Sequence, residues 1–221
     1  MCLSIAETNN VAAIKQIHKK IKIKIITRFK EFKEILTKGT QEDIFAELIF
    51  CLLTPQSKAK SCWDSVKRLV KKNLLLVGDK NQIVQELTGI RFKYKKAGYI
   101  IEARSLFLKS GKLSIKEKLF QLKYPLQMRD WLVQNIRGIG YKEASHFLRN
   151  IGLGDSLAIL DRHILKNLKL LQIIENPPRS LTKKKYIEIE KKMRNFAKRI
   201  NIPINHLDLV LWYKETGQIF K

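Results

Sequence analysis

Apolar residues return every three or four positions along almost the whole chain, and this spacing limits its fold more than any other feature. Such a period places apolar side chains on one face of an α-helix, whereas a half-buried strand requires strict alternation. The clearest alternating stretch, residues 21–26, lies within a long charged segment that has no glycine or proline to interrupt a helix. We therefore expect this stretch to be helical too, and the sequence predicts an all-α protein.

Capping residues and prolines suggest where individual helices begin and end. Thr40 and Asp43 form a capping-box pattern ahead of an apolar stripe that stops at Pro55. Ser57 is expected to open a second helix, with one face made of Ala59, Cys62, Trp63, Val66 and Val70. Further helices are expected near residues 80–87, 94–109, 125–136, 141–151, 161–172, 182–200 and 205–214.

The charge of the chain points to an anionic partner. Lys and Arg number 44 against 20 Asp and Glu, which gives a formal net charge of +24. This excess adds self-repulsion to the folded state, so it usually serves a partner such as nucleic acid or, as a second choice, an anionic membrane surface. A lysine-rich proteome bias is the alternative. The chain has no apolar run of about 18 residues that would span a membrane, and residues 1–14 lack the pattern of a secretory signal.

Cysteine usage fits a protein of the reducing cytosol. The three cysteines Cys2, Cys51 and Cys62 are odd in number and lack paired spacing, so we expect free thiols. Cys51 and Cys62 lie on apolar helix faces, where a small buried side chain is the expected role. Three cysteines cannot ligate a four-cysteine iron–sulfur cluster. We expect neither a metal nor a cofactor.

The segment Gly138-Ile139-Gly140 separates two amphipathic helices. Two glycines around one aliphatic residue permit a tight turn, which also exposes N–H groups at the start of the second helix. A phosphate can bind such a helix N-terminus. In so basic a chain, the pattern predicts a DNA-binding helix–hairpin–helix, with Arg137, Gly138 and Gly140 at the DNA backbone. A plain αα-hairpin is the alternative.

Lys142 and Asp161 are the candidate chemical groups near this hairpin. On its helix, Lys142 lies about 190° from the apolar stripe, next to His146 and Arg149. It therefore points away from the core of its own helix, as a solvated lysine also would. Asp161 is a lone acid after the apolar run at residues 157–160, and by its position alone it indicates a helix N-cap.

The Gly-Ile-Gly-Tyr-Lys142 hairpin with Asp161 downstream resembles the helix–hairpin–helix DNA glycosylase superfamily. Asp161-Arg-His163 is similar to the Asp-x-His ending of that family, and residues 52–57 resemble its segment that fills the gap left by a flipped base. The C-terminal segment 208–221 resembles that of the type-2 8-oxoguanine DNA glycosylases of archaea and bacteria. The resemblance covers the chain from about residue 42 to its end.

The resemblance implies an architecture and a partner. It implies one unit over residues 1–221, with two helical subdomains that flank a DNA-binding cleft and contain the helix–hairpin–helix motif. The subdomains would be residues 40–150, and residues 1–39 together with 151–221. The expected partner is double-stranded DNA that contains 8-oxoguanine or abasic sites. We expect a monomer with no membrane partner, located in the cytoplasm and associated with the nucleoid.

The resemblance also implies a mechanism. The enzyme would flip the damaged nucleotide into a pocket, where neutral Lys142 would attack C1′, expel the base and leave a Schiff base. Asp161 would stabilise the positive charge that develops on the sugar, and β-elimination would then nick the strand. Because an ordinary lysine pKa is about 10.4, burial or nearby cations must lower it, and His146 and Arg149 are candidates for those cations.

Four residues are expected to bind substrate. The resemblance implies that Lys221, at the chain terminus, helps to distinguish 8-oxoguanine from guanine, whereas by its position alone it would be a disordered end. Its carboxylate would accept the N7–H that only 8-oxoguanine carries. Trp212 is either a stacking surface for the flipped purine or a core residue, and Gln56 is either a wedge or an ordinary loop residue. His146, beside Lys142 on its helix, completes the set.

Three rival functions share part of this pattern. An endonuclease-III-like glycosylase for oxidised pyrimidines has the lysine and the acid but usually carries an iron–sulfur cluster. A non-enzymatic helix–hairpin–helix module that grips the DNA backbone would need neither Lys142 nor Asp161. A basic RNA-binding protein is the third, although no aromatic RNA-binding signature is visible.

Overall fold

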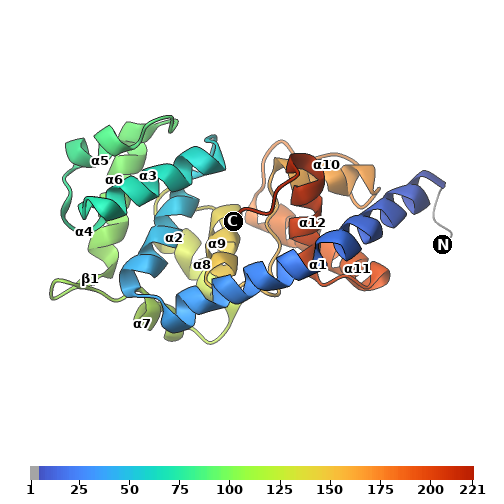
Figure 1. Ribbon diagram of the computed structural model, residues 1–221, viewed down its shortest axis with the longest axis horizontal. Coiled ribbons are helices and arrows are strands. Elements are labelled where there is room, and N and C mark those ends of the chain that lie inside the picture. Colours follow the sequence, from blue (N-terminus) through green and yellow to red (C-terminus); the bar gives the residue numbers. More distant parts are fainter. Residues whose placement is uncertain (1–4) are drawn as a thin grey trace.

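The structure, a computed structural model, describes residues 5–221 and is built almost entirely of helices (Figure 1). The all-α prediction is confirmed, since the only strands among the described residues are a two-residue antiparallel pair, β1 (Leu108–Lys109) and β2 (Lys112–Leu113). The helices are α1 (Ile5–Lys38), α2 (Gln41–Leu53), α3 (Ala59–Lys71), α4 (Leu74–Val77), α5 (Lys80–Glu86), α6 (Lys93–Phe107), α7 (Ile115–Phe120), α8 (Pro125–Asn135), α9 (Tyr141–Asn150), α10 (Arg162–Leu170), α11 (Lys183–Ile200) and α12 (Ile204–Thr216).

Most helix boundaries agree with the sequence analysis, and the differences have simple causes. The alternating residues 21–26 lie within α1, and Thr40 and Asp43 form the expected capping box. Helix α3 begins two residues after Ser57, with Lys58 at its N-cap. Its buried face was partly wrong, because Val70 is 50% exposed and Leu69 is buried instead. Helices α4 and α7 and the β1–β2 pair were not expected, because so few residues show no clear period.

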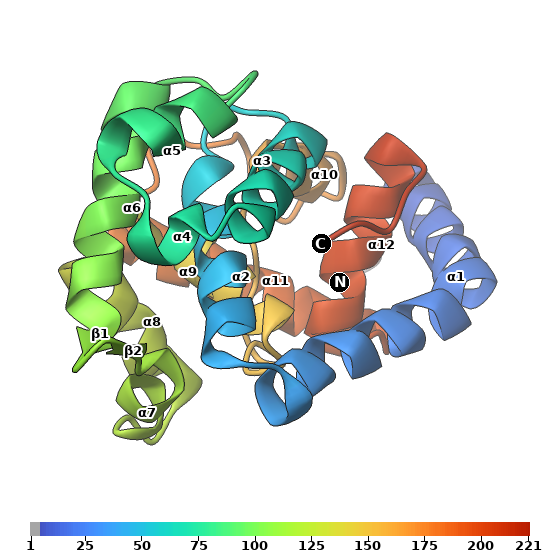
Figure 2. The same ribbon diagram turned by 60° about the vertical axis from the view of Figure 1, so that its left-hand side comes forward.

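Buried hydrophobic side chains form two clusters, each made from a different part of the chain. The first draws on residues 44–157, and the second joins residues 11–32 of α1 to residues 158–211. Helix α1 packs on α12 and also contacts α9 and α2, so it runs along both groups of helices (Figure 1). The C-terminus ends between the two groups, beside α12, as a second view shows (Figure 2).

The two cysteines in the described residues take the expected place in the core. Cys51 and Cys62 are both free and fully buried, while Cys2 lies outside the described residues. The Cys62 thiol donates to the Leu53 carbonyl oxygen over 3.3 Å. Within residues 5–221, no helix combines the length and the apolar character needed to cross a membrane.

The turn between α8 and α9 requires glycine at its first position. Gly138 has a φ of +86°, in the left-handed region that side chains rarely adopt. A Cβ atom added there would also lie 2.5 Å from Cδ2 of the Tyr99 ring. Arg137 stacks on the same ring, 5.2 Å from its centroid, and its exposed guanidinium group lies 3.5 Å from Glu102. The hairpin is therefore held against α6 through Tyr99.

Candidate active site

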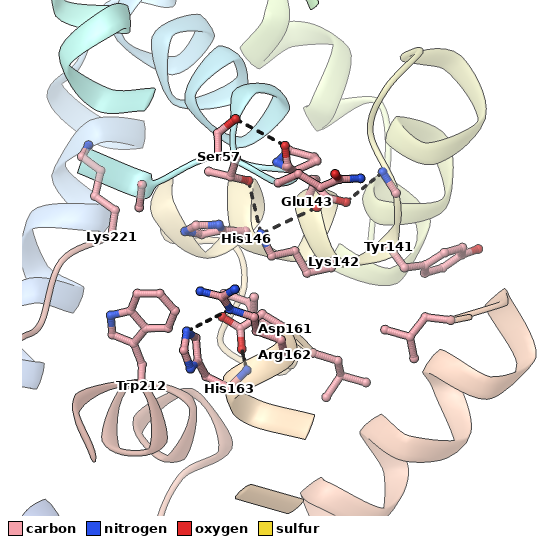
Figure 3. A pocket seen from close by; sticks show the side chains of 18 of the residues that line it. Ser57, Tyr141, Lys142, Glu143, His146, Asp161, Arg162, His163, Trp212 and Lys221 are labelled. Atoms are coloured by element: carbon pink, nitrogen blue, oxygen red, sulfur yellow. Dashed lines mark hydrogen bonds and ion pairs between the residues drawn. The ribbon is translucent and has the colours of Figure 1, made fainter. Parts of the chain in front are cut away.

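A cavity of about 830 Å³ is lined by residues from both groups of helices (Figure 3). The loop before α3, the start of α9, the start of α10, α12 and the last residue of the chain all reach it. Among the residues expected to act at a site, those that line it are Gln56, Gly140, Lys142, His146, Asp161, Trp212 and Lys221. Arg137 and Gly138 are not among the residues that line it.

Lys142 lies in the first turn of α9, with Gly140 at the N-cap. Its ammonium group donates a hydrogen bond to Oγ1 of Thr54 over 3.2 Å and lies 3.6 Å from Oε1 of Glu143. The other carboxylate oxygen of Glu143 accepts from the Gly140 N–H over 3.2 Å. The hairpin turn and the position of the lysine are therefore linked through one acidic side chain.

The face of α9 that carries Lys142 is covered rather than solvated. His146 and Arg149 follow Lys142 on that face, and both are buried. Arg149 donates to Asp208 of α12 over 2.5 Å. Burial raises the pKa of the Asp208 carboxyl to about 6, although the Arg149 cation opposes this shift.

His146 does not supply the positive charge that was expected beside Lys142. Burial, followed by the nearby Arg149 cation, holds the pKa of His146 well below its ordinary value. The imidazole is therefore neutral at neutral pH. Its ring meets the Phe50 ring nearly at right angles, with centroids 5.5 Å apart. His146 contributes a neutral polar ring to the cavity wall, and this part of the expectation was wrong.

Asp161 is both a helix cap and a cavity residue. As the N-cap of α10, its Oδ1 atom accepts from the backbone N–H groups of His163 and Ile164, each over 2.8 Å. The structural role that its position indicated is therefore present. The same side chain lines the cavity that Lys142 lines, and its Oδ2 atom takes no part in the cap. One carboxylate oxygen can thus hold the helix while the other faces a bound group.

A buried lysine, which the sequence analysis did not single out as a site residue, shapes the loop that carries Gln56. Lys96 of α6 donates to the carbonyl oxygens of Leu53 and Pro55, both over 2.7 Å, and to Oγ of Ser57 over 3.2 Å. Its burial lowers the pKa of the ammonium group. Gln56 itself is exposed, has a φ of +56° and lines the cavity.

The end of the chain is packed into the site. The ammonium group of Lys221 pairs with the buried carboxylate of Glu47 and lies 3.4 Å from the centroid of the Trp63 ring. An ion pair and a cation–π contact therefore both hold the terminal residue. Sequence reasoning missed Glu47 as its partner, although an acid among the apolar residues of α2 was a visible signal.

Trp212 is half-buried, and its ring meets the His163 ring edge-on, with centroids 5.1 Å apart. The indole Nε1 atom is buried and has no hydrogen-bond partner within residues 5–221. A buried donor without a partner is costly, and Trp212 is one of the residues that line the cavity. In the described part of the chain, no group of three or more His, Cys, Asp and Glu side chains is arranged to hold a metal ion.

The fold and the cavity define a class of protein. The helix–hairpin–helix places Lys142 at a cavity that Asp161 also lines, and residues from both helical cores of this strongly basic chain surround it. This is the arrangement of the helix–hairpin–helix DNA glycosylases. A family model described as 8-oxoguanine DNA glycosylase matches residues 25–202. The chain belongs to that family.

Individual relatives agree with the family. A Fusobacterium nucleatum protein named 8-oxoguanine DNA glycosylase/AP lyase is 46% identical over 208 residues, which cover 94% of this chain and 96% of that protein. The crystal structure of the 8-oxoguanine DNA glycosylase of Thermotoga maritima has a TM-score of 0.86 at 34% identity and covers 97% of this chain and 100% of that one. The Methanocaldococcus jannaschii 8-oxoguanine glycosylase/lyase, in complex with a 15mer DNA containing 8-oxoguanine, has a TM-score of 0.86 at 36% identity, covering 96% and 99%.

Proposed function

We propose that this chain removes 8-oxoguanine from double-stranded DNA and then nicks the resulting abasic site by β-elimination. The observation that carries the proposal is that Lys142 and Asp161, which lie on separate helices, line the same cavity. The named activities of the similar bacterial and archaeal proteins support it. A net charge of +24 suits a polyanionic substrate.

Lys142 is the nucleophile in this proposal. After a nucleotide is flipped into the cavity, the neutral amine attacks C1′, the glycosidic bond breaks, and the base leaves. The sugar ring opens to a Schiff base on Nζ, which acidifies the C2′ hydrogen and permits β-elimination of the 3′ phosphate. Thr54 and Glu143, which contact the ammonium group, hold it at the cavity wall, and the carboxylate of Glu143 can receive its proton.

Asp161 stabilises the positive charge that develops on the sugar as the base departs. A carboxylate at that point acts on the transition state, where charge appears, more than on the ground state. Its Oδ1 is already fixed by two backbone N–H groups, so the carboxylate needs no reorganisation during the reaction.

The remaining candidate site residues recognise the base and the DNA. The Trp212 ring, the neutral His146 and the Lys221 terminus form the base pocket, and exposed Gln56 fills the gap in the stack. The hairpin residues Arg137, Gly138 and Gly140 bind the DNA backbone.

In this proposal the two subdomains are residues 40–150, and residues 1–39 together with 151–221. The two hydrophobic clusters follow this division except at Ile151 and Leu157, which belong to the first cluster. The enzyme works as a monomer in the cytoplasm, associated with the nucleoid.

Borohydride trapping tests the proposal directly, because it reduces a Schiff base to a stable covalent adduct. We expect an adduct on duplexes that contain 8-oxoguanine or an abasic site, and none with Lys142→Gln. Lys198→Gln, an exposed lysine of α11 outside the cavity, is the matched control and should trap like the wild type.

A thymine glycol duplex separates the rival activities. Preferential release of thymine glycol would support the pyrimidine glycosylase instead. DNA binding with no adduct on any duplex would support a non-enzymatic module. An undiminished adduct in Lys142→Gln would remove Lys142 from the mechanism.

A further inference from the structure

The segment that leads into Asp161 is short, buried and tied to a single tyrosine hydroxyl. Residues 157–160 are all buried but lie outside any helix. Tyr186 of α11 is fully buried beside them. Its hydroxyl donates to the Ala158 carbonyl oxygen over 2.6 Å, and the Leu160 N–H donates to the hydroxyl oxygen over 3.3 Å. One oxygen atom therefore fixes the backbone at Ala158 and at Leu160, just before the cap residue Asp161.

The same hydroxyl reaches the helix that carries Lys142. It lies 3.4 Å from the hydroxyl of Ser145, which follows Lys142 by three residues in α9. Residues three apart lie on neighbouring faces of a helix, one turn from each other. Tyr186 therefore joins the element of the nucleophile to the element of the carboxylate, although it belongs to neither.

A buried ion pair closes the network around this tyrosine. Arg129 of α8 donates to both carboxylate oxygens of Glu190, over 2.8 and 3.1 Å, and to the Ser145 hydroxyl over 3.3 Å. Glu190 also accepts from the Ala158 N–H over 2.8 Å. Both charged side chains are almost completely buried. Because such a network has few alternative arrangements, it holds one geometry of the segment.

A phenylalanine would fill the same space without a hydroxyl that needs partners in the core. Burial of an unpaired hydroxyl is costly, and here the hydroxyl is paired with backbone groups of the Asp161 segment. Burial also raises the pKa of the Tyr186 phenol, so it remains a neutral donor. The hydroxyl therefore contributes something that the ring alone does not.

We propose that Tyr186 is a positioning residue for the reaction, whose hydroxyl fixes the segment that carries Asp161 relative to the helix that carries Lys142. This inference rests on the proposed function. Tyr186 acts through Asp161, and it needs no contact of its own with the reacting sugar.

Tyr186→Phe tests the proposal, since it removes the hydroxyl and keeps the ring. We expect the single-turnover rate of 8-oxoguanine excision to fall about 10- to 100-fold, the range for small misplacements of a reacting group. The affinity for the duplex should not change. Tyr213→Phe, on α12 outside the cavity, is the matched control, because its hydroxyl has no hydrogen-bond partner in the described residues. It should keep the wild-type rate.

A double-mutant cycle with Asp161→Asn identifies the route of the effect. If Tyr186 acts through Asp161, Tyr186→Phe should slow the wild type but hardly slow the Asp161→Asn enzyme. Full additivity of the two losses would overturn the proposal. The proposal would also be overturned if Tyr186→Phe lowered the melting temperature but kept the wild-type excision rate per active enzyme, with active enzyme counted by borohydride trapping. The hydroxyl would then be only structural.

Ser145→Ala provides a second variant if Tyr186→Phe fails to fold. It removes the link to α9 and should give a smaller loss of rate in the same direction, with no loss in affinity. An unchanged rate in that variant would overturn the joining role. A wild-type protein that forms no borohydride adduct contradicts the proposed function, whereas an active wild type with a fully active Tyr186→Phe contradicts only this inference.

Discussion

Replacing Asp161 by Asn separates its two roles, because Asn retains the cap and loses the charge. The Asp161 Oδ1 atom accepts from two backbone N–H groups, and an Asn side chain caps helices about as well as Asp. Loss of a negative charge at the N-terminus of α10 costs about 0.3–1 kcal/mol. In a chain of this size, 1 kcal/mol changes the melting temperature by about 2–4 °C. We therefore expect only a small loss of stability.

The rate of base excision should fall far more than the stability. A group that stabilises charge in the transition state contributes about 100- to 1,000-fold in rate, or about 2.7–4 kcal/mol. The assay is single-turnover excision of 8-oxoguanine with enzyme in excess, with thermal unfolding of the same samples. Excess enzyme makes the rate independent of DNA release, so it reports the chemical steps.

Asp161→Ala serves as the control for the cap. It should lose as much rate as Asp161→Asn but also about 1–2 kcal/mol of stability, because both backbone N–H groups lose their acceptor. If Asp161→Asn retains the wild-type rate while Asp161→Ala is unstable, the residue is only a helix cap. The mechanism proposed for the site would then be refuted.

Three further predictions concern the hairpin, the C-terminus and the buried histidine. Gly138→Ala should lower the free energy of unfolding, measured in urea, by about 2–5 kcal/mol, because its φ is left-handed and the added Cβ would clash with Tyr99. Gly111→Ala, whose added Cβ meets nothing, should lower it by about 1–2 kcal/mol. Equal losses in the two variants would contradict this. Deletion of Lys221 should impair 8-oxoguanine excision much more than abasic-site nicking, and equal loss of both would exclude a role in base recognition. Because the pKa of His146 is lowered in the folded state, stability should decrease as the pH falls below about 6.5, by at most about 1.4 kcal/mol per pH unit, and His146→Gln should make that decrease shallower.

The helices and the hairpin could be predicted because their signals are local. The spacing of apolar residues identifies a helix face, and Thr40 with Asp43 marks a helix start without reference to distant residues. The two glycines of the hairpin likewise limit the turn by their own backbone freedom. Lys142 and Asp161 were placed near helix starts for the same reason, and the structure has both there.

The sequence could not show what covers a polar helix face. Lys142, His146 and Arg149 share one face of α9, and a face with such residues is usually solvated. In the folded chain, α12 supplies Asp208 as the partner of Arg149, and burial keeps His146 neutral. The pairing of Arg149 therefore depends on a helix about sixty residues further along the chain, so no local pattern contains it.

The tertiary structure also decided which polar groups meet around the site. Lys96 looks like one more solvated lysine in a basic segment, yet it is buried under the loop that carries Gln56. Glu47 and Lys221 lie 174 residues apart in the sequence and pair beside the cavity. The sequence by itself determined the helices, the hairpin turn and the two candidate chemical groups, because these depend on neighbours within one or two turns. Only the tertiary structure decided which buried charges are paired and which side chains line the cavity, because long-range packing sets both.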